Sequence, residues 1–167
     1  MSRSYEPLTL EDLRQLGKLA KTDRGNLFDR RPETGNLYRN RLFAVALCQG
    51  AALHFLDGKN GIKDFDVWSF YTEAPERPFP YRRNTSMDFG DPKFGISEDA
   101  PHFVGRRVDM LGRSLKGADP AAPVDSLRRY LSQKATSTAF YLAQKAVILI
   151  EPEDLLGYVV WPITARK

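Results

Sequence analysis

Three aspartates, Asp64, Asp66 and Asp109, are the residues of this sequence whose type and spacing could do chemistry. Asp64 and Asp66 stand two positions apart in segment 62–71, whose apolar alternation is typical of a β-strand. Side chains two positions apart in a strand point to the same face of its sheet. Asp109 lies among apolar residues in a second strand-like segment, and it is the natural third acid if the two strands are neighbours.

Carboxylates that converge in this way are suited to a divalent metal. Magnesium prefers hard oxygen ligands in near-octahedral geometry. Nucleotidyl transfer depends on such metals, which bridge carboxylates and triphosphate oxygens. We therefore expect Asp64, Asp66 and Asp109 to be metal ligands and catalytic residues. The alternative interpretation is a half-exposed edge strand whose polar face is solvated.

The elements that must position these acids can be sketched from the same sequence. Leucines at positions 10, 13, 16 and 19 form one apolar stripe of a helix, with Thr9 as its N-cap and Asp12 completing a capping box. The other expected helices lie near 37–47, after Gly50, and over 124–133, 136–145 and 152–156. The expected strands are 62–71, 102–111, 146–150 and 158–161, and the expected loops are 21–36 and 71–101, the second with a hairpin near Asp91-Pro92.

Interleaved helices and strands predict an α+β, or mixed α/β, fold in which helices flank a small mixed sheet. The 167 residues, 42% of them hydrophobic, suit a single domain, 1–167, with a long loop excursion at 71–101. No apolar run reaches the ~20 residues that cross a bilayer. The first residues lack a secretory pattern and Cys48 is the only cysteine, so we expect a cytoplasmic protein with no membrane partner.

Positive charge gathers in segment 77–116, where eight Lys and Arg residues face five Asp and Glu residues. That segment carries +3 of the formal net charge of +4. The surplus attracts the phosphates of a nucleotide or of RNA, although a solvated basic face explains the charge equally well. Of Arg106 and Arg107, one can face a nucleotide beside Asp109, and Arg82-Arg83 could clamp phosphate or an acidic acceptor.

Two motifs carry a resemblance to a known family. Segment 46–54, with Gln49-Gly50-Ala51 at its centre, precedes the strand motif Lys63-Asp-Phe-Asp-Val-Trp68. Together they resemble the defining motif of the DNA polymerase beta-like nucleotidyltransferase superfamily, in which a glycine turn opens a helix and an Asp-x-Asp strand follows. The resemblance is strongest to the minimal bacterial branch, which includes abortive-infection-type toxins, and it covers about residues 47–111.

The resemblance implies the nucleotidyltransferase fold and a magnesium- or manganese-dependent enzyme. Such an enzyme moves a nucleoside monophosphate from a nucleoside triphosphate, such as ATP, to an acceptor hydroxyl on RNA, protein or a small molecule. A toxin with an antitoxin protein as partner would fit the family and the small size. The implied nucleotide-binding residues are Gln49, Gly50, Ala51 and Arg107, beside the metal ligands Asp64, Asp66 and Asp109.

Gln49 departs from the family pattern, because it stands where the first glycine of the usual pair is found. The alternative function is therefore a catalytically lapsed nucleotidyltransferase-fold module that binds RNA or a partner protein through segment 77–116. A third possibility is an α+β interaction domain with no nucleotide site, in which the motif match is a coincidence.

Overall fold

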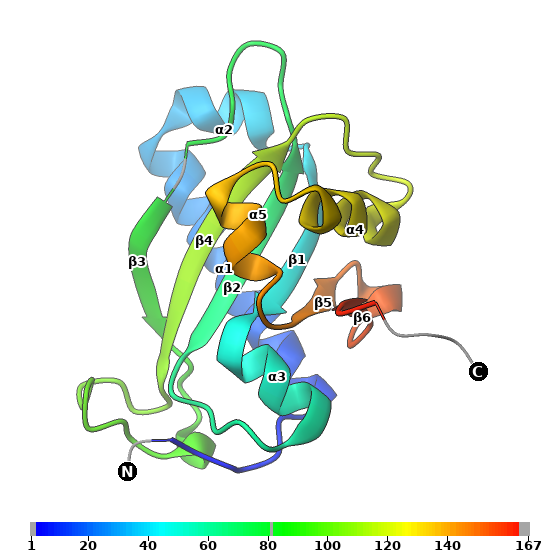
Figure 1. Cartoon of the computed structure of the whole chain (residues 1–167). Coiled ribbons are helices and arrows are strands. Elements are labelled where there is room, and N and C mark those ends of the chain that lie inside the picture. Colours follow the sequence, from blue (N-terminus) through cyan, green and yellow to red (C-terminus); the bar gives the residue numbers. More distant parts are fainter. Residues whose placement is uncertain (1–2, 81, 164–167) are drawn as a thin grey trace.

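The computed structural model describes residues 3–80 and 82–163, with only the backbone described at residues 82–84. In this part of the chain five α-helices and one six-stranded mixed sheet form an α+β structure, with helices on both faces of the sheet (Figure 1). The helices are α1 (Leu10–Arg30), α2 (Pro32–Tyr38), α3 (Gln49–Asp57), α4 (Pro123–Gln133) and α5 (Ser137–Leu142). The strands are β1 (Leu42–Cys48), β2 (Phe65–Thr72), β3 (Arg82–Asp88), β4 (Arg107–Leu115), β5 (Val147–Glu151) and β6 (Val159–Trp161).

The strand order is β3-β4-β2-β1-β5-β6. Strands β2 and β4 pair in parallel, whereas the four other pairs are antiparallel. The two strands expected to carry the acids are therefore neighbours in the interior of the sheet.

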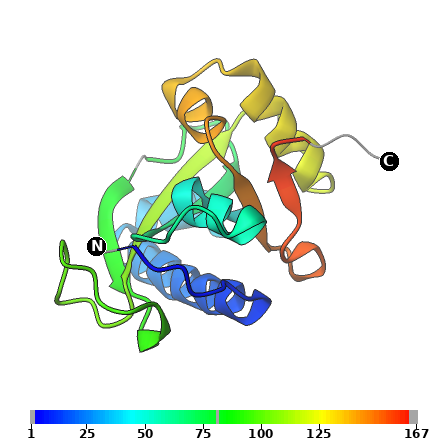
Figure 2. The same cartoon turned by 60° about the horizontal axis from the view of Figure 1, so that its bottom comes forward.

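The two faces of β2 enter different hydrophobic cores. Phe65 and Val67 pack with Leu13 and Leu16 of α1 on one face. Trp68 and Phe70 belong to the core on the other face, which is closed by side chains of α4 and α5. Figure 2 shows the sheet between α1 and the α4–α5 pair. The alternation predicted for β2 is thus confirmed, and it places Asp66 on the face of α5 because Asp66 lies two positions before Trp68.

The N-terminal third contains two wrong predictions. Segment 21–36 is not a loop, because α1 continues to Arg30 by burying Leu27 and Phe28, and α2 follows. Segment 37–47 was expected to be a helix, but most of it forms β1. An apolar run buried on both faces has no period by which a strand can be told from a helix. The capping box is confirmed, since Thr9 and Asp12 exchange backbone-to-side-chain hydrogen bonds of 2.9 and 3.2 Å.

The expected loop 71–101 contains a strand, since β3 pairs antiparallel with β4 at the edge of the sheet. The polar sequence of β3 gives no strand signal, because an edge strand needs no apolar alternation. A 3₁₀ helix, Pro92–Phe94, stands in place of the expected hairpin. The predicted strand 102–111 is shifted, since β4 begins at Arg107.

The C-terminal elements follow the predictions closely. Helices α4 and α5 and strands β5 and β6 lie within the expected segments or one residue beyond them. The short helix expected at 152–156 is a 3₁₀ helix, Glu153–Leu155. None of the helices in the described residues combines the length and apolar character needed to span a membrane.

Candidate functional site

The site is built on the parallel pairing of β2 with β4, in which Asp66 lies opposite Asp109. Neighbouring strands run about 4.8 Å apart, so two carboxylates at such partners on one face lie side by side. Asp66 is also the register partner of Cys48, the last residue of β1. Asp66 is therefore flanked by Asp109 on one side and by the start of α3 on the other.

Asp64, Asp66 and Asp109 line one pocket of about 690 Å³, which is within the usual range for small-molecule sites. The sheet supplies its floor and α5 supplies a wall with two exposed aromatic rings. The other lining residues are Trp68, Leu111, Ser137, Thr138, Phe140 and Tyr141. The α5 residues were not found by sequence reasoning, because the docking of a helix on a sheet is a long-range contact that local patterns do not report.

Asp64 reaches the pocket from the turn just before β2, not from the strand itself. This turn is fixed by Arg106, whose side chain is buried and donates to the carbonyl oxygens of Lys63 at 3.2 Å and Phe94 at 3.1 Å. Burial lowers the pKa of the Arg106 guanidinium, and the charge of Asp64 partly opposes this effect. Arg106 thus stabilises the backbone beside the site, whereas the Arg107 side chain contacts Asp64 and Asp109.

Arg107 lies between two of the three carboxylates. Its Nη2 donates to Asp64 Oδ2 at 3.0 Å, and its Nε lies 3.2 Å from Asp109 Oδ1 without a hydrogen bond. The hydroxyl of Ser86 in β3 donates to the same Asp109 oxygen at 2.8 Å. Arg107, whose side chain is 40% exposed, therefore offsets only part of the negative charge of Asp64 and Asp109.

The first turn of α3 begins directly beside Asp66, and no side chain caps it. Uncapped N–H groups at a helix N-terminus favour anions. A Cβ at Gly50 would meet no atom within 4 Å, so the surrounding side chains do not require glycine there. Open space above the backbone leaves room for a phosphate. The Ala51 side chain is buried in the core on the α1 side, so only its backbone can take part.

Gln49 adopts a left-handed backbone conformation with φ of 67°. This region strongly favours glycine, which is the residue that the family resemblance places at this position. The Gln49 side chain is buried, and its Nε2 donates to the backbone oxygen of Tyr141 at 3.3 Å. The Gln49 side chain therefore joins α3 to the α5 wall, and the nucleotide-binding role of this residue stays a prediction.

The carboxylates of Asp66 and Asp109 suit a metal ion that is also coordinated by the phosphates of a bound substrate. As the side chains stand, no group of three His, Cys, Asp or Glu residues within 3–80 and 82–163 could hold a metal ion. Magnesium, however, is commonly bound by one or two carboxylates together with phosphates and waters. Asp66 and Asp109 provide that donor set, because they are adjacent and face one pocket.

Cys48 is buried on the same face as Asp66 and has no role in the pocket lining. Burial raises the pKa of its thiol well above the ordinary value, and the charge of Asp66 raises it further. The side chains of Arg82 and Arg83, expected as a phosphate clamp, lie outside the described residues.

Comparison of the chain with models of protein families, with curated proteins and with solved structures finds no match. The function must therefore be argued from the geometry of the pocket.

Proposed function

We propose that this protein is a magnesium-dependent nucleotidyltransferase, which moves a nucleoside monophosphate from a nucleoside triphosphate to an acceptor hydroxyl and releases pyrophosphate. One observation carries this proposal: Asp66 and Asp109 are register partners on parallel strands, and they face a pocket of ligand size. The uncapped start of α3 next to Asp66 adds a place for phosphate oxygens.

The acids of the pocket and the neighbouring start of α3 take different roles in this reaction. The N–H groups of Gly50 and Ala51 bind the triphosphate, because the Gln49 N–H already donates to the Ala146 carbonyl oxygen at 3.2 Å. Asp66 and Asp109 would hold magnesium, which would neutralise charge on the phosphate oxygens. The acceptor oxygen forms a bond to the α-phosphorus, the bond from that phosphorus to the bridging oxygen breaks, and pyrophosphate leaves. The acceptor proton passes to the carboxylate of Asp109, which faces the pocket.

The aromatic wall gives the nucleoside a place beside the acids. Phe140 and Tyr141 are 56% and 58% exposed, although large apolar surfaces are usually buried. Both rings line the acid pocket. Stacking of a base on such rings stabilises a nucleotide without selecting one base. We therefore propose binding of several nucleoside triphosphates, ATP among them.

Asp66→Asn tests this function, with Asp29→Asn as its matched control. Asp29 is an exposed residue of α1, outside the pocket, and loses the same charge. Calorimetry with ATP, GTP, CTP and UTP should show binding by the wild type in magnesium and much weaker binding in a metal chelator. Pyrophosphate release with cell extract as the source of acceptor should fall at least about a hundredfold in Asp66→Asn and stay unchanged in Asp29→Asn. Equal release by the two variants would refute the catalytic role.

Two observations favour a second candidate, a catalytically lapsed module with the same ligand. Arg107 already offsets part of the charge of Asp64 and Asp109, and Gln49 occupies a left-handed backbone position that favours glycine. In that case nucleotide would bind without release of pyrophosphate, whatever acceptor is supplied. The RNA or protein acceptor and the antitoxin partner stay predictions in both cases.

A further inference from the structure

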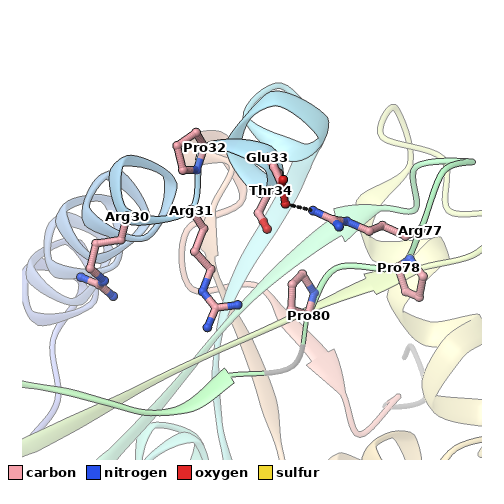
Figure 3. A pocket seen from close by; sticks show the side chains of 8 residues that line it. All are labelled: Arg30, Arg31, Pro32, Glu33, Thr34, Arg77, Pro78 and Pro80. Carbon is pink, nitrogen blue, oxygen red and sulfur yellow. Dashed lines mark ion pairs between the residues drawn. The ribbon is translucent and has the colours of Figure 1, made fainter.

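A second cavity of about 690 Å³ lies at the other end of β2, away from the acids. It is formed where α1 ends and α2 begins, together with the loop after β2 (Figure 3). Strand β2 runs from Phe65 to Thr72, so its two ends are separated by about 23 Å at 3.3 Å per residue. The lining residues are Arg30, Arg31, Pro32, Glu33, Thr34, Arg77, Pro78 and Pro80.

Among the described residues, the lining contains three arginines and one acidic residue, Glu33. Arg77 Nη2 lies 3.7 Å from Glu33 Oε1, and the Glu33 side chain is 88% exposed, so this ion pair contributes little stabilisation. Arg30 and Arg31 take part in no ion pair within the described part of the chain. Like charges gathered at one cavity repel one another until an anion enters.

The wall that carries Arg77 is held on both sides by buried groups. The Tyr38 hydroxyl donates to the Arg77 carbonyl oxygen and accepts from the Ala74 N–H at 3.0 Å. Beyond Arg77, the Phe79 N–H donates to Ser114 Oγ at 2.9 Å, and the Phe79 ring stacks on Tyr71 with centroids 4.3 Å apart. Both interactions keep the backbone of this arginine in place without any ligand, which lowers the entropy cost of binding one.

The opposite wall is the junction of α1 and α2. Figure 3 shows Arg30 and Arg31 extending to the same side of this junction, with Arg77 reaching across from the other wall towards Glu33. Pro32, Pro78 and Pro80 line the cavity between these arginines, and proline restricts the backbone at each of these positions. Planar guanidinium groups on two sides suit an anion with several oxygens in different directions.

We propose that this arginine cavity binds a small molecule through its phosphomonoester or pyrophosphate group. The volume matches a small ligand, and the excess of guanidinium groups matches a phosphate of charge −2 or greater. The proposal is independent of the reaction at the acid pocket, because none of the described residues lines both cavities.

Pyrophosphate is the probe for this site, titrated into the full chain at low salt with a metal chelator present. Without metal the carboxylates of the acid pocket repel the probe. The test variant is Arg30→Gln with Arg31→Gln, both exposed side chains, so folding should be retained and can be checked by circular dichroism. The matched control is Arg129→Gln with Lys134→Gln, which removes two positive charges from exposed positions at α4, outside both cavities.

Pyrophosphate should bind the wild type and the control equally, and the Arg30–Arg31 variant at least about tenfold more weakly. The Arg77 side-chain N–H resonance should also shift on titration of the wild type. Absence of pyrophosphate binding, or equal loss in variant and control, would overturn the proposal. Binding of a single-stranded oligoribonucleotide through these arginines, with none of pyrophosphate, would overturn it as well, because the ligand would then be a nucleic acid.

Discussion

Asp109 lies directly opposite Asp66 in the parallel pairing of β4 with β2. The two residues are separated by 43 positions in the sequence, and only the crossover through β3 brings them together. Both face the pocket that α5 closes. The proposed function depends on this pair, and the predictions below test the charges and the backbone around it.

Arg107 pairs with the carboxylates of Asp64 and Asp109 and offsets part of their charge, so its removal should increase the uncompensated negative charge. We expect Arg107→Gln to lower the free energy of unfolding by about 1 kcal/mol without metal, since the ion pairs are partly exposed. Magnesium should raise the melting temperature of this variant more than that of the wild type, because the metal replaces the missing cation.

Arg14→Gln is the control for Arg107, because Arg14 also pairs with two carboxylates, Glu11 and Glu153. Its thermal unfolding should show the same magnesium response as the wild type. An equal response in all three proteins would contradict a metal site at these acids.

Gly50→Ala separates ligand binding from stability. Alanine is favoured over glycine in a helix by up to about 1 kcal/mol, and nothing within 4 Å opposes its Cβ. We expect an unchanged or higher melting temperature, together with at least about tenfold weaker nucleotide binding, since the methyl group occupies the phosphate position. Gly25→Ala is the control, because Gly25 is an exposed residue of α1 whose added Cβ would also meet no atom within 4 Å. It should change the melting temperature as Gly50→Ala does and leave nucleotide binding unaltered.

At Gln49, replacement by glycine should give a more stable protein than replacement by alanine, the reverse of the usual order in a helix. The φ of 67° at this position costs a non-glycine residue about 1 kcal/mol, and alanine keeps this cost while losing the bond to Tyr141. Chemical denaturation should therefore rank Gln49→Gly about 1 kcal/mol more stable than Gln49→Ala. The opposite order would mean that the left-handed conformation is wrong.

Asp88 should make the protein sensitive to acid. Burial alone would raise the pKa of this carboxyl, but the N–H groups of Gly105, Gly90 and Val104 donate to it and lower its pKa below the ordinary value. The ionised form therefore stabilises the fold above the unfolded-state pKa of about 3.9, and this contribution disappears as the pH falls through the folded-state pKa.

Urea unfolding of Asp88→Asn between pH 7 and pH 3 measures this effect. The variant should be less stable than the wild type at pH 7 and should lose less stability on acidification. Asp29→Asn provides the comparison, since Asp29 is exposed and should retain the acid sensitivity of the wild type. Parallel curves for the wild type and Asp88→Asn would contradict the role of this carboxylate.

The sequence was most informative where one face of an element is buried. The stripe of α1, the capping box at Thr9 and the alternation in β2 are local patterns, and each was predicted. Strand β1 was mistaken for a helix because both its faces are buried, and β3 was missed because a polar edge strand has no apolar pattern.

The candidate site was predicted only in part, because local patterns do not report contacts between distant segments. Acids at spacing two, and a third on a later strand, were readable from the sequence. The contact of Arg107 with Asp64 joins two segments that are distant in the sequence, so no local pattern predicts it. The aromatic wall of α5 and the arginine cavity depend on contacts between distant segments.

A crystal of the protein grown with Mn²⁺ and a non-hydrolysable nucleoside triphosphate tests the central claim most directly. Anomalous scattering should locate manganese within about 2.5 Å of a carboxylate oxygen of both Asp66 and Asp109, with triphosphate oxygens completing its coordination. Arg107 should then have left at least one of its two partners. A nucleotide bound elsewhere, or manganese absent from this pair of aspartates, would contradict the account.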